Sequence, residues 1–276
     1  MGAARLAEYR VVARNVAAQS ENRIHDDTVA RQYGFGGGLV PGVIVYAYAT
    51  SPLVATLGAP WLARGTVTIR FVKPVLDGEE IRIAGSLVRE ASEDLGASLS
   101  VRSGGGQECA VATAMLPAAP ASALDVRDHP ETPLPADRPR ASPESLVPGR
   151  VLGTIETLYE EGRAARFLDE VGDDHALYRG SEGLVHPAFF LDQANRALVA
   201  NVHLGPWIHV ASAVRHLGEA RVGARYATRG RVAALWARRG RELVELDLLV
   251  VAEPETRPVA HVRHTAIWKL PRPEAS

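Results

Sequence analysis

One short segment near the start of the chain concentrates side chains suited to proton transfer. Glu21, Asn22, His25 and Asp27 lie within seven residues of one another, and an uncharged run follows from Leu39. An imidazole has an unperturbed pKa of roughly 6.5, so His25 can accept or donate a proton at physiological pH. A nearby carboxylate would adjust that pKa and supply a second proton carrier. By residue type His25 is thus suited to general acid-base chemistry, whereas a histidine near a helix start more often caps or packs.

A second segment, His186 to Gln193, reads HPAFFLDQ and places Asp192 on a predicted helix. If the two segments face one cleft, His25 and Asp192 can form a composite pair. Asp192 with Gln193 also fits the polar side of an otherwise apolar helix, so both interpretations stay open. No HExxH or CxxC pattern accompanies the histidines, and the sequence predicts no metal.

The first segment resembles the active segment of the MaoC-like (R)-specific enoyl-CoA hydratase and acyl dehydratase family. In that family an Asp and a His hold the water that adds across an enoyl double bond. The resemblance implies substrate-binding positions at Asn22, Asp27 and Gly42, with the Gly42 amide polarising the thioester carbonyl. Asp27 also suits the first turn of a helix. The positions in step with the motif are Asn22, Ile24, His25, Asp27, Ala30, Gly34, Phe35 and Gly42.

The motif is degenerate at two positions. Ser20 stands where the family has its catalytic Asp, and Arg23 replaces a Pro. Three explanations remain open. Glu21 supplies the carboxylate after a one-residue shift. Alternatively Asp192 supplies it from the second half, in the manner of polyketide synthase dehydratase domains, which the HPAFFLDQ segment resembles. In the third, the catalytic function is lost or changed, which leaves a thioesterase or a non-catalytic acyl-thioester binder.

The elements that must position these residues occur twice. Residues 1–117 read as strand, loop, apolar helix from about Pro41 and four strands, and residues 149–276 repeat this order with a helix over Pro187–His203. Residues 118–148 form a proline-rich linker between them. One helix wrapped by an antiparallel sheet is typical of the hot-dog fold. The sequence therefore predicts an α+β tandem, or double, hot-dog protein whose halves pair edge to edge.

The composition limits the classes of partner and the cellular location that we expect for this protein. Thirty-one basic against 32 acidic residues give a net charge of −1, which argues against nucleic acid. Prolines and glycines interrupt the uncharged segment from Leu39 to Ala59, so we expect a core helix and not a membrane span. Cys109 has no disulfide partner, and the start of the chain lacks a secretion signal, so a cytoplasmic location is expected. We expect no cofactor beyond coenzyme A or phosphopantetheine on the substrate, and a homodimer or a hydratase partner subunit is possible.

Three further features of the sequence give local expectations. The Gly36–Gly38 run predicts a flexible loop that admits substrate. The arginine-rich stretch from Arg215 to Arg241 predicts a solvated sheet face or half of an ion-pair network. The alternative is a contact with the phosphates of coenzyme A or of an acyl carrier's phosphopantetheine. Histidines on predicted strands are expected at the surface: His203, His209, His216, His261 and His264.

Overall fold

The computed structural model describes residues 4–90, 92–120, 122 and 124–271. The first half contains strands with alternating burial and one long apolar helix. Its elements are β1 (Ala4–Arg5), β2 (Tyr9–Val12), α1 (Asp27–Gln32), α2 (Gly42–Arg64), β3 (Thr66–Phe71), β4 (Glu80–Arg89), β5 (Leu95–Ser103) and β6 (Glu108–Leu116).

The second half repeats this plan and adds a helix that the sequence analysis did not predict. Its elements are β7 (Val151–Leu158), α3 (Glu161–Val171), α4 (Ala188–Asn201), β8 (Ile208–His216), β9 (Arg225–Arg238), β10 (Arg241–Glu253) and β11 (Arg257–Lys269). The extra helix, α3, lies where we expected loop. It buries Ala164, Leu168 and Val171 on one face and ends at Gly172, which has a positive φ of 64°.

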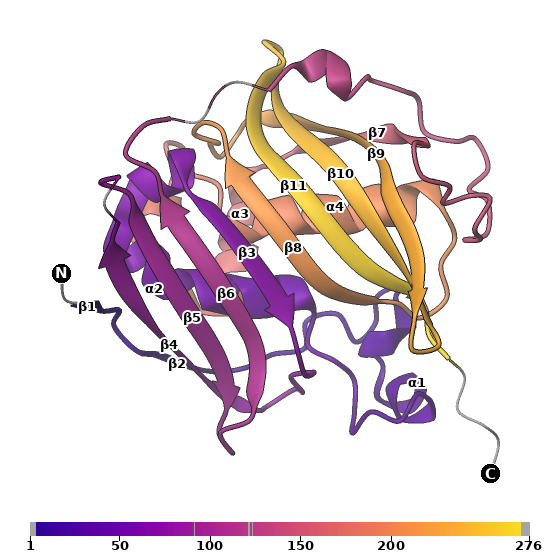
Figure 1. Ribbon diagram of the computed structural model, residues 1–276, viewed down its shortest axis with the longest axis horizontal. Helices are drawn as coiled ribbons and strands as arrows, with labels where there is room; N and C mark the ends of the chain where they lie inside the picture. The colour runs from indigo at the N-terminus through magenta and orange to yellow at the C-terminus, as the bar shows by residue number, and fades with distance from the viewer. Residues whose placement is uncertain (1–3, 91, 121, 123, 272–276) are drawn as a thin grey trace.

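All strands belong to one antiparallel sheet, ordered β1-β4-β5-β6-β3-β8-β11-β10-β9-β7, with β2 paired to β4. The halves join where β3 pairs with β8, for example Val67 opposite Val214. Both central helices, α2 and α4, lie on the same side of this sheet and contact each other (Figure 1). The predicted double hot-dog fold, paired edge to edge, is confirmed.

Helix α2 is the apolar segment that could be mistaken for a membrane span. Its length and hydropathy would suffice to cross a bilayer, but 67% of its most apolar window is buried inside the protein. Val43, Leu53 and Trp61 are among the side chains that it packs against the sheet and α4. It is therefore the core helix of the first half, as the sequence predicted.

The expectation that the strand histidines lie at the surface is wrong for three of them. His209, His216 and His264 are buried, because β8 and β11 are central strands and these side chains point toward the helices. The expectation of an ion-pair network is met in part on the other sheet face. There Arg229 pairs with Glu131 and Glu253.

The linker follows this outer face. Leu124 and Val126 pack on Ala227, Leu249 and Val251 of the second half. Residues 121 and 123 of the predicted linker lie outside the described residues.

Candidate functional site

Two cavities meet at the start of α2. One has a volume of about 440 Å³ and lies between the first-half loop, α3 and α4. The other, of about 360 Å³, extends toward β3, β8 and the start of β10. Both are lined by the same five residues, one of them an imidazole, so the two cavities lie side by side at this point. The shared residues are Asn22, His25, Pro41, Asn195 and Trp207.

His25 is held in one tautomer at this junction. Its Nδ1 lies 2.7 Å from the carbonyl oxygen of Leu39, and because a carbonyl only accepts, Nδ1 carries the proton. Its Nε2 lies 3.3 Å from the side-chain amide of Asn22. Burial lowers the pKa of His25, while the bond to Leu39 opposes that shift. The ring is therefore neutral near pH 7, with an unprotonated Nε2.

The loop around His25 is packed tightly, contrary to the expectation of a flexible entrance. Gly38 passes so close that a Cβ there would lie 2.2 Å from the His25 carbonyl oxygen. The Gly38 amide donates to Asp27 at 2.7 Å, and Asn15 donates to the His25 carbonyl at 2.8 Å. The predicted substrate-binding residue Asp27 thus anchors the glycine segment, and it lines neither cavity.

Asn22 joins the two halves beside His25. Its side-chain oxygen accepts from the Trp207 amide at 3.1 Å, and its side-chain nitrogen donates to the Trp207 carbonyl at 3.0 Å. The same oxygen caps the short turn that carries His25 by accepting from Ile24. Asn22 lies on the wall of both cavities, and its hydrogen bonds are made to the backbone of Trp207 and Ile24 and to the His25 ring. Its position beside Nε2 makes it a residue that orients the imidazole.

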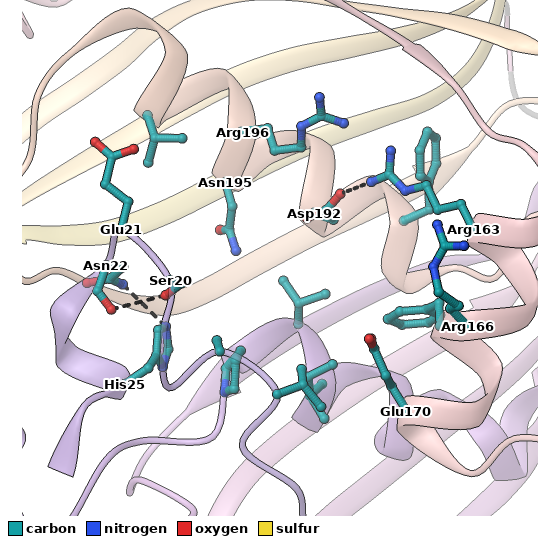
Figure 2. Close-up of a pocket in the computed structure, with 18 of the residues that line it drawn as sticks. Ser20, Glu21, Asn22, His25, Arg163, Arg166, Glu170, Asp192, Asn195 and Arg196 are labelled. Carbon is teal, nitrogen blue, oxygen red and sulfur yellow. Dashed lines mark hydrogen bonds and ion pairs between the residues drawn. The ribbon is translucent and has the colours of Figure 1, made fainter.

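The two carboxylates proposed as partners of His25 are engaged with basic groups. Glu21 is exposed and lies 3.3 Å from Arg138 of the linker. Asp192 lies 2.7 Å from Arg163 on α3. Figure 2 shows His25 and Asp192 on opposite sides of the larger cavity, with the side chain of Asn195 between them. Within the described residues, neither carboxylate makes a hydrogen bond or ion pair with His25.

Asp192 nevertheless has an unusual environment. Enclosure by α3 and α4 raises its pKa, and the charges of Arg163 and Arg196 partly offset that rise. About 37% of its side-chain surface is exposed, and it lines the cavity. Ser20, at the position of the family's Asp, also lines the cavity, where its hydroxyl donates to the Asn22 carbonyl at 3.3 Å.

Sequence reasoning missed Asn195 and Arg163. Asn195 follows Asp192 by three residues, so it occupies the same face of α4. Its side-chain oxygen is buried and has no partner among the described residues. The i, i+3 spacing could have indicated it. Arg163 was missed with its helix, although Ala164, Leu168 and Val171 have the apolar spacing of a helix.

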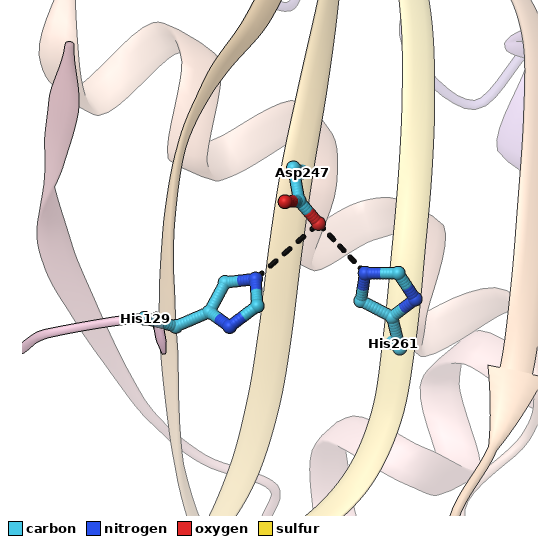
Figure 3. Close-up of side chains that lie close together, drawn as sticks. All are labelled: His129, Asp247 and His261. Atoms are coloured by element: carbon cyan, nitrogen blue, oxygen red, sulfur yellow. Dashed lines mark hydrogen bonds and ion pairs between the residues drawn. The ribbon is translucent and has the colours of Figure 1, made fainter. Parts of the chain in front are cut away.

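A second polar cluster lies on the outer face of the sheet. Both His129 Nε2 and His261 Nε2 face one oxygen of Asp247, at 3.3 and 2.6 Å (Figure 3). Two imidazoles and a carboxylate are a donor set that transition metals accept. However, Arg231 lies 3.0 Å and Arg263 3.9 Å from the other oxygen. These two positive charges already neutralise the carboxylate and would repel a cation. The cluster instead fastens the linker, through His129, to the second half.

No family model matches this chain. No curated protein matches it in sequence. Among solved structures, a conserved hypothetical protein of Mycobacterium tuberculosis with a double hot-dog fold is 16% identical, with a TM-score of 0.66 over 96% of each chain. A Chloroflexus aurantiacus protein described as a MaoC domain dehydratase is 10% identical, with a TM-score of 0.65 over 96% of this chain and 95% of that one.

A Novosphingobium aromaticivorans protein described as a thioesterase is 14% identical, with a TM-score of 0.56 over 95% and 96% of the two chains. At these identities the likeness establishes the double hot-dog fold, which hosts both dehydratases and thioesterases. The reaction has to be argued from the site.

Proposed function

We propose that the chain is an acyl-thioester hydratase or dehydratase that uses His25 as its acid-base group. The observation that carries the proposal is the tautomer: a neutral imidazole, fixed by the Leu39 carbonyl, presents an unprotonated Nε2 where the two cavities meet. Hot-dog neighbours described as MaoC-like dehydratases are consistent with it. Acyl and thiol portions of a substrate would occupy the two cavities, with the reacting carbons beside Nε2.

The chemistry requires one proton carrier. Nε2 removes a proton from water as the water oxygen bonds to C3 of a 2-enoyl thioester, and the C2=C3 electron pair moves toward the carbonyl oxygen. The imidazolium then returns that proton to C2, which yields the 3-hydroxyacyl thioester. Dehydration is the reverse. Asn195, which lines both cavities beside His25, is the residue proposed to orient the water. Coenzyme A or phosphopantetheine is the proposed handle, and no other cofactor is proposed.

The decisive assay follows the conjugated double bond of crotonyl-CoA and of a longer enoyl-CoA spectrophotometrically, while free thiol is monitored. Loss of the double bond without thiol release, abolished in His25→Gln, supports the proposal. His203→Gln is the matched control, because this exposed histidine lines neither cavity. Unchanged turnover in a folded His25→Gln protein excludes the assigned role of His25.

A thioesterase is the second candidate, favoured by the cavity-facing carboxylate of Asp192 with its raised pKa and by neighbours described as thioesterases. Asp192 would activate water against the thioester carbonyl. Thiol release that disappears in Asp192→Asn would establish this reaction. Thioester binding with neither signal would favour a non-catalytic binder or a partner subunit.

A cytoplasmic location and a homodimer stay predictions.

A further inference from the structure

One wall of the larger cavity carries three arginines, two from α3 and one from α4: Arg163, Arg166 and Arg196. Figure 2 shows them around Asp192, at the end of the cavity opposite His25. A cavity that accepts a plain hydrocarbon chain is lined mainly by apolar side chains, with few polar groups placed where the ligand needs them. Three guanidinium groups in one wall therefore indicate that part of the ligand is polar.

Two of these arginines are held in place by neighbouring side chains. Arg163 lies 2.7 Å from the carboxylate of Asp192, and its guanidinium lies 5.8 Å from the ring centre of Tyr159, within the range of a cation–π contact. Arg196 donates to the Thr157 hydroxyl at 3.0 Å. A planar guanidinium held in this way offers its remaining N–H groups in a fixed geometry, which suits a carboxylate or a phosphate.

The third arginine, Arg166, has its charge available to a ligand. It is exposed at the cavity wall. Within the described part of the chain it makes no ion pair and no side-chain hydrogen bond, and this includes Glu170, which lies one turn later on α3 and also lines the cavity. The guanidinium of Arg166 can therefore bind an anion without breaking a contact inside the protein.

The charges of this wall do not cancel. The acids that line the larger cavity are Glu21, Glu170 and Asp192. Glu21 lies on the His25 side and pairs with Arg138 of the linker at 3.3 Å (Figure 2). Enclosure raises the pKa of Asp192, and the charges of two arginines oppose that rise. Three guanidinium groups thus face two carboxylates at the α3–α4 end, which leaves one positive charge for an anionic ligand.

The distance from His25 decides which anion fits. Asn195 lines both cavities together with His25, and Asp192 precedes it by three residues on the same face of α4. Three residues of helix rise by about 4.5 Å, so the arginines around Asp192 lie about one helical turn from the residues that the cavities share. The phosphate of coenzyme A or of a carrier arm is separated from the thioester by two amide-linked units, which is too far. A carboxylate at the end of a short acyl chain is at the right distance.

We propose that the larger cavity binds the acyl group and selects chains that end in a carboxylate, which Arg166 and the remaining N–H groups of Arg163 and Arg196 bind. The substrate class is then the thioester of a short dicarboxylic acid. This inference rests on the proposed function for the thioester itself. The chain is oriented from both ends, with its carboxylate at the arginines and its reacting carbons beside His25.

The test compares two saturated coenzyme A thioesters of matched shape, neither of which has a double bond to hydrate. Glutaryl-CoA ends in a carboxylate, and 5-methylhexanoyl-CoA has an isopropyl group in its place. Isothermal titration calorimetry of the wild-type protein should give glutaryl-CoA a dissociation constant about tenfold lower. Arg166→Gln should remove most of this preference. Arg150→Gln is the matched control, since Arg150 is exposed and lines neither cavity, and it should retain the preference.

The two thioesters carry the same phosphates, so they distinguish the acyl group from the handle. Equal weakening of both by Arg166→Gln would assign the arginines to the phosphates and overturn the inference. It is also overturned by a wild-type protein that shows no preference or binds neither thioester, and by a preference that Arg166→Gln leaves unchanged. Should Arg166→Gln not fold, Glu170→Gln decides. Loss of that negative charge should tighten the binding of glutaryl-CoA alone, and unchanged binding overturns the inference.

The outcomes also separate this inference from the proposed reaction. A preference that depends on Arg166, in a protein that hydrates no enoyl-CoA, supports the carboxylate site and removes the hydratase assignment. Hydration of crotonyl-CoA by a protein without the preference overturns the carboxylate site alone.

Discussion

The loop before α2 (residues 20–42) and the loop before α4 (residues 173–188) share one backbone design. Each begins with a short 3₁₀ turn, Arg23–His25 in the first and Ala176–Tyr178 in the second. The turns are capped alike, since the side chains of Asn22 and His175 accept from the amide two residues later. The hot-dog duplication is therefore visible in local hydrogen bonds, although the two sequences show no obvious repeat.

The correspondence continues along both loops, in the residues that precede the central helices. A Cβ on Gly38 would strike the carbonyl of His25, and a Cβ on Gly183 would lie 2.7 Å from that of Tyr178. The next residue of each loop donates its amide back to the turn: Leu39 to Ile24 at 3.3 Å, and Leu184 to Leu177 at 2.7 Å.

The two loops differ in the side chain that ends the 3₁₀ turn. Tyr178 occupies the place of His25, and Asp173 occupies the place of Ser20. Tyr178 is 2% exposed and packs on buried His186, which in turn packs on Phe167 of α3. His25 instead borders two cavities. The same backbone thus holds a cavity-lining histidine in one half and a core tyrosine in the other. A carboxylate, Asp173, stands at the position equivalent to Ser20 only in the half whose turn ends in that tyrosine.

Substituting His25 and its counterpart Tyr178 should give the largest difference in activity between the two loops. His25→Gln should reduce enoyl-CoA hydration by about a thousandfold, because among the described residues that line both cavities it removes the one titratable side chain. Tyr178→Phe should leave turnover unchanged and stability equal or higher, since the Tyr178 hydroxyl is buried and unpaired among the described residues. Steady-state kinetics and thermal unfolding of both variants test this. Comparable losses of turnover in both would contradict the division of roles.

The fold, and the place of His25 beside a cavity, could be predicted because both depend on local pattern. Alternating strands, two apolar helices and the proline-rich linker specify two hot-dog units, and the motif around His25 lies within one loop. The pairing of Asp192 could not be predicted in the same way. Its partner, Arg163, lies on a helix whose apolar face is only three residues, and the ion pair forms only when α3 packs beside α4.

The burial of His209 beside the smaller cavity could not be predicted, for a different reason. Strand alternation indicates that residues share a face but not which face is inside, and a bulge shifts that alternation between His209 and Ser212. Only the pairing of β8 with both β3 and β11 buries it. Residues contributed by one half to the cavity of the other are therefore the part of the site that a single sequence conceals.

The two close-packed glycines offer the next contrast. Gly38→Ala and Gly183→Ala should each lower the free energy of unfolding by about 2–3 kcal/mol, because the added methyl group meets a backbone carbonyl that has to move. Only Gly38→Ala should also reduce turnover, about tenfold or more, since the displaced carbonyl belongs to His25. Denaturant unfolding and kinetics on the same preparations check both parts. Equal activity in the two variants would show that the His25 loop tolerates displacement.

The side chains that cap the two 3₁₀ turns should differ by a smaller amount in their contribution to the free energy of unfolding. Asn22→Ala removes the cap and both hydrogen bonds to Trp207, so we expect a loss of about 2 kcal/mol. His175→Ala removes its cap alone and should cost about 1 kcal/mol. The Asn22 variant should also lose activity because His25 Nε2 loses its neighbour. Identical stabilities of the two variants would mean that the Trp207 contact contributes nothing across the junction of the halves.

The smallest expected effects are those of mild acid. Protonation of His25 in the first loop should lower activity, and the buried His186 in the second loop should make the folded protein less stable. Burial lowers the pKa of His25 and of His186 below 6.5, with Asp173 partly restoring that of His186. His25 acts as a base, so kcat/KM should fall as pH drops below 6.5 and level off above it. His186 stays neutral in the folded protein while the unfolded chain takes up the proton. The free energy of unfolding should therefore also decrease as pH falls below 6.5.

Replacing each histidine should separate these two responses. His186→Phe should reduce the pH dependence of the unfolding free energy by its own share, while the buried His209, His216 and His264, whose pKa values are also lowered, maintain the rest. It should leave the kinetic profile in place. His25→Asn or His25→Gln should abolish the kinetic profile and, because His25 is itself buried enough to have a lowered pKa, reduce the stability slope as well. Urea unfolding and initial rates between about pH 5 and 8 measure both quantities. A kinetic profile that moves with His186→Phe would show that the two loops are coupled through the contact of α2 with α4, and the halves would then not be functionally separate.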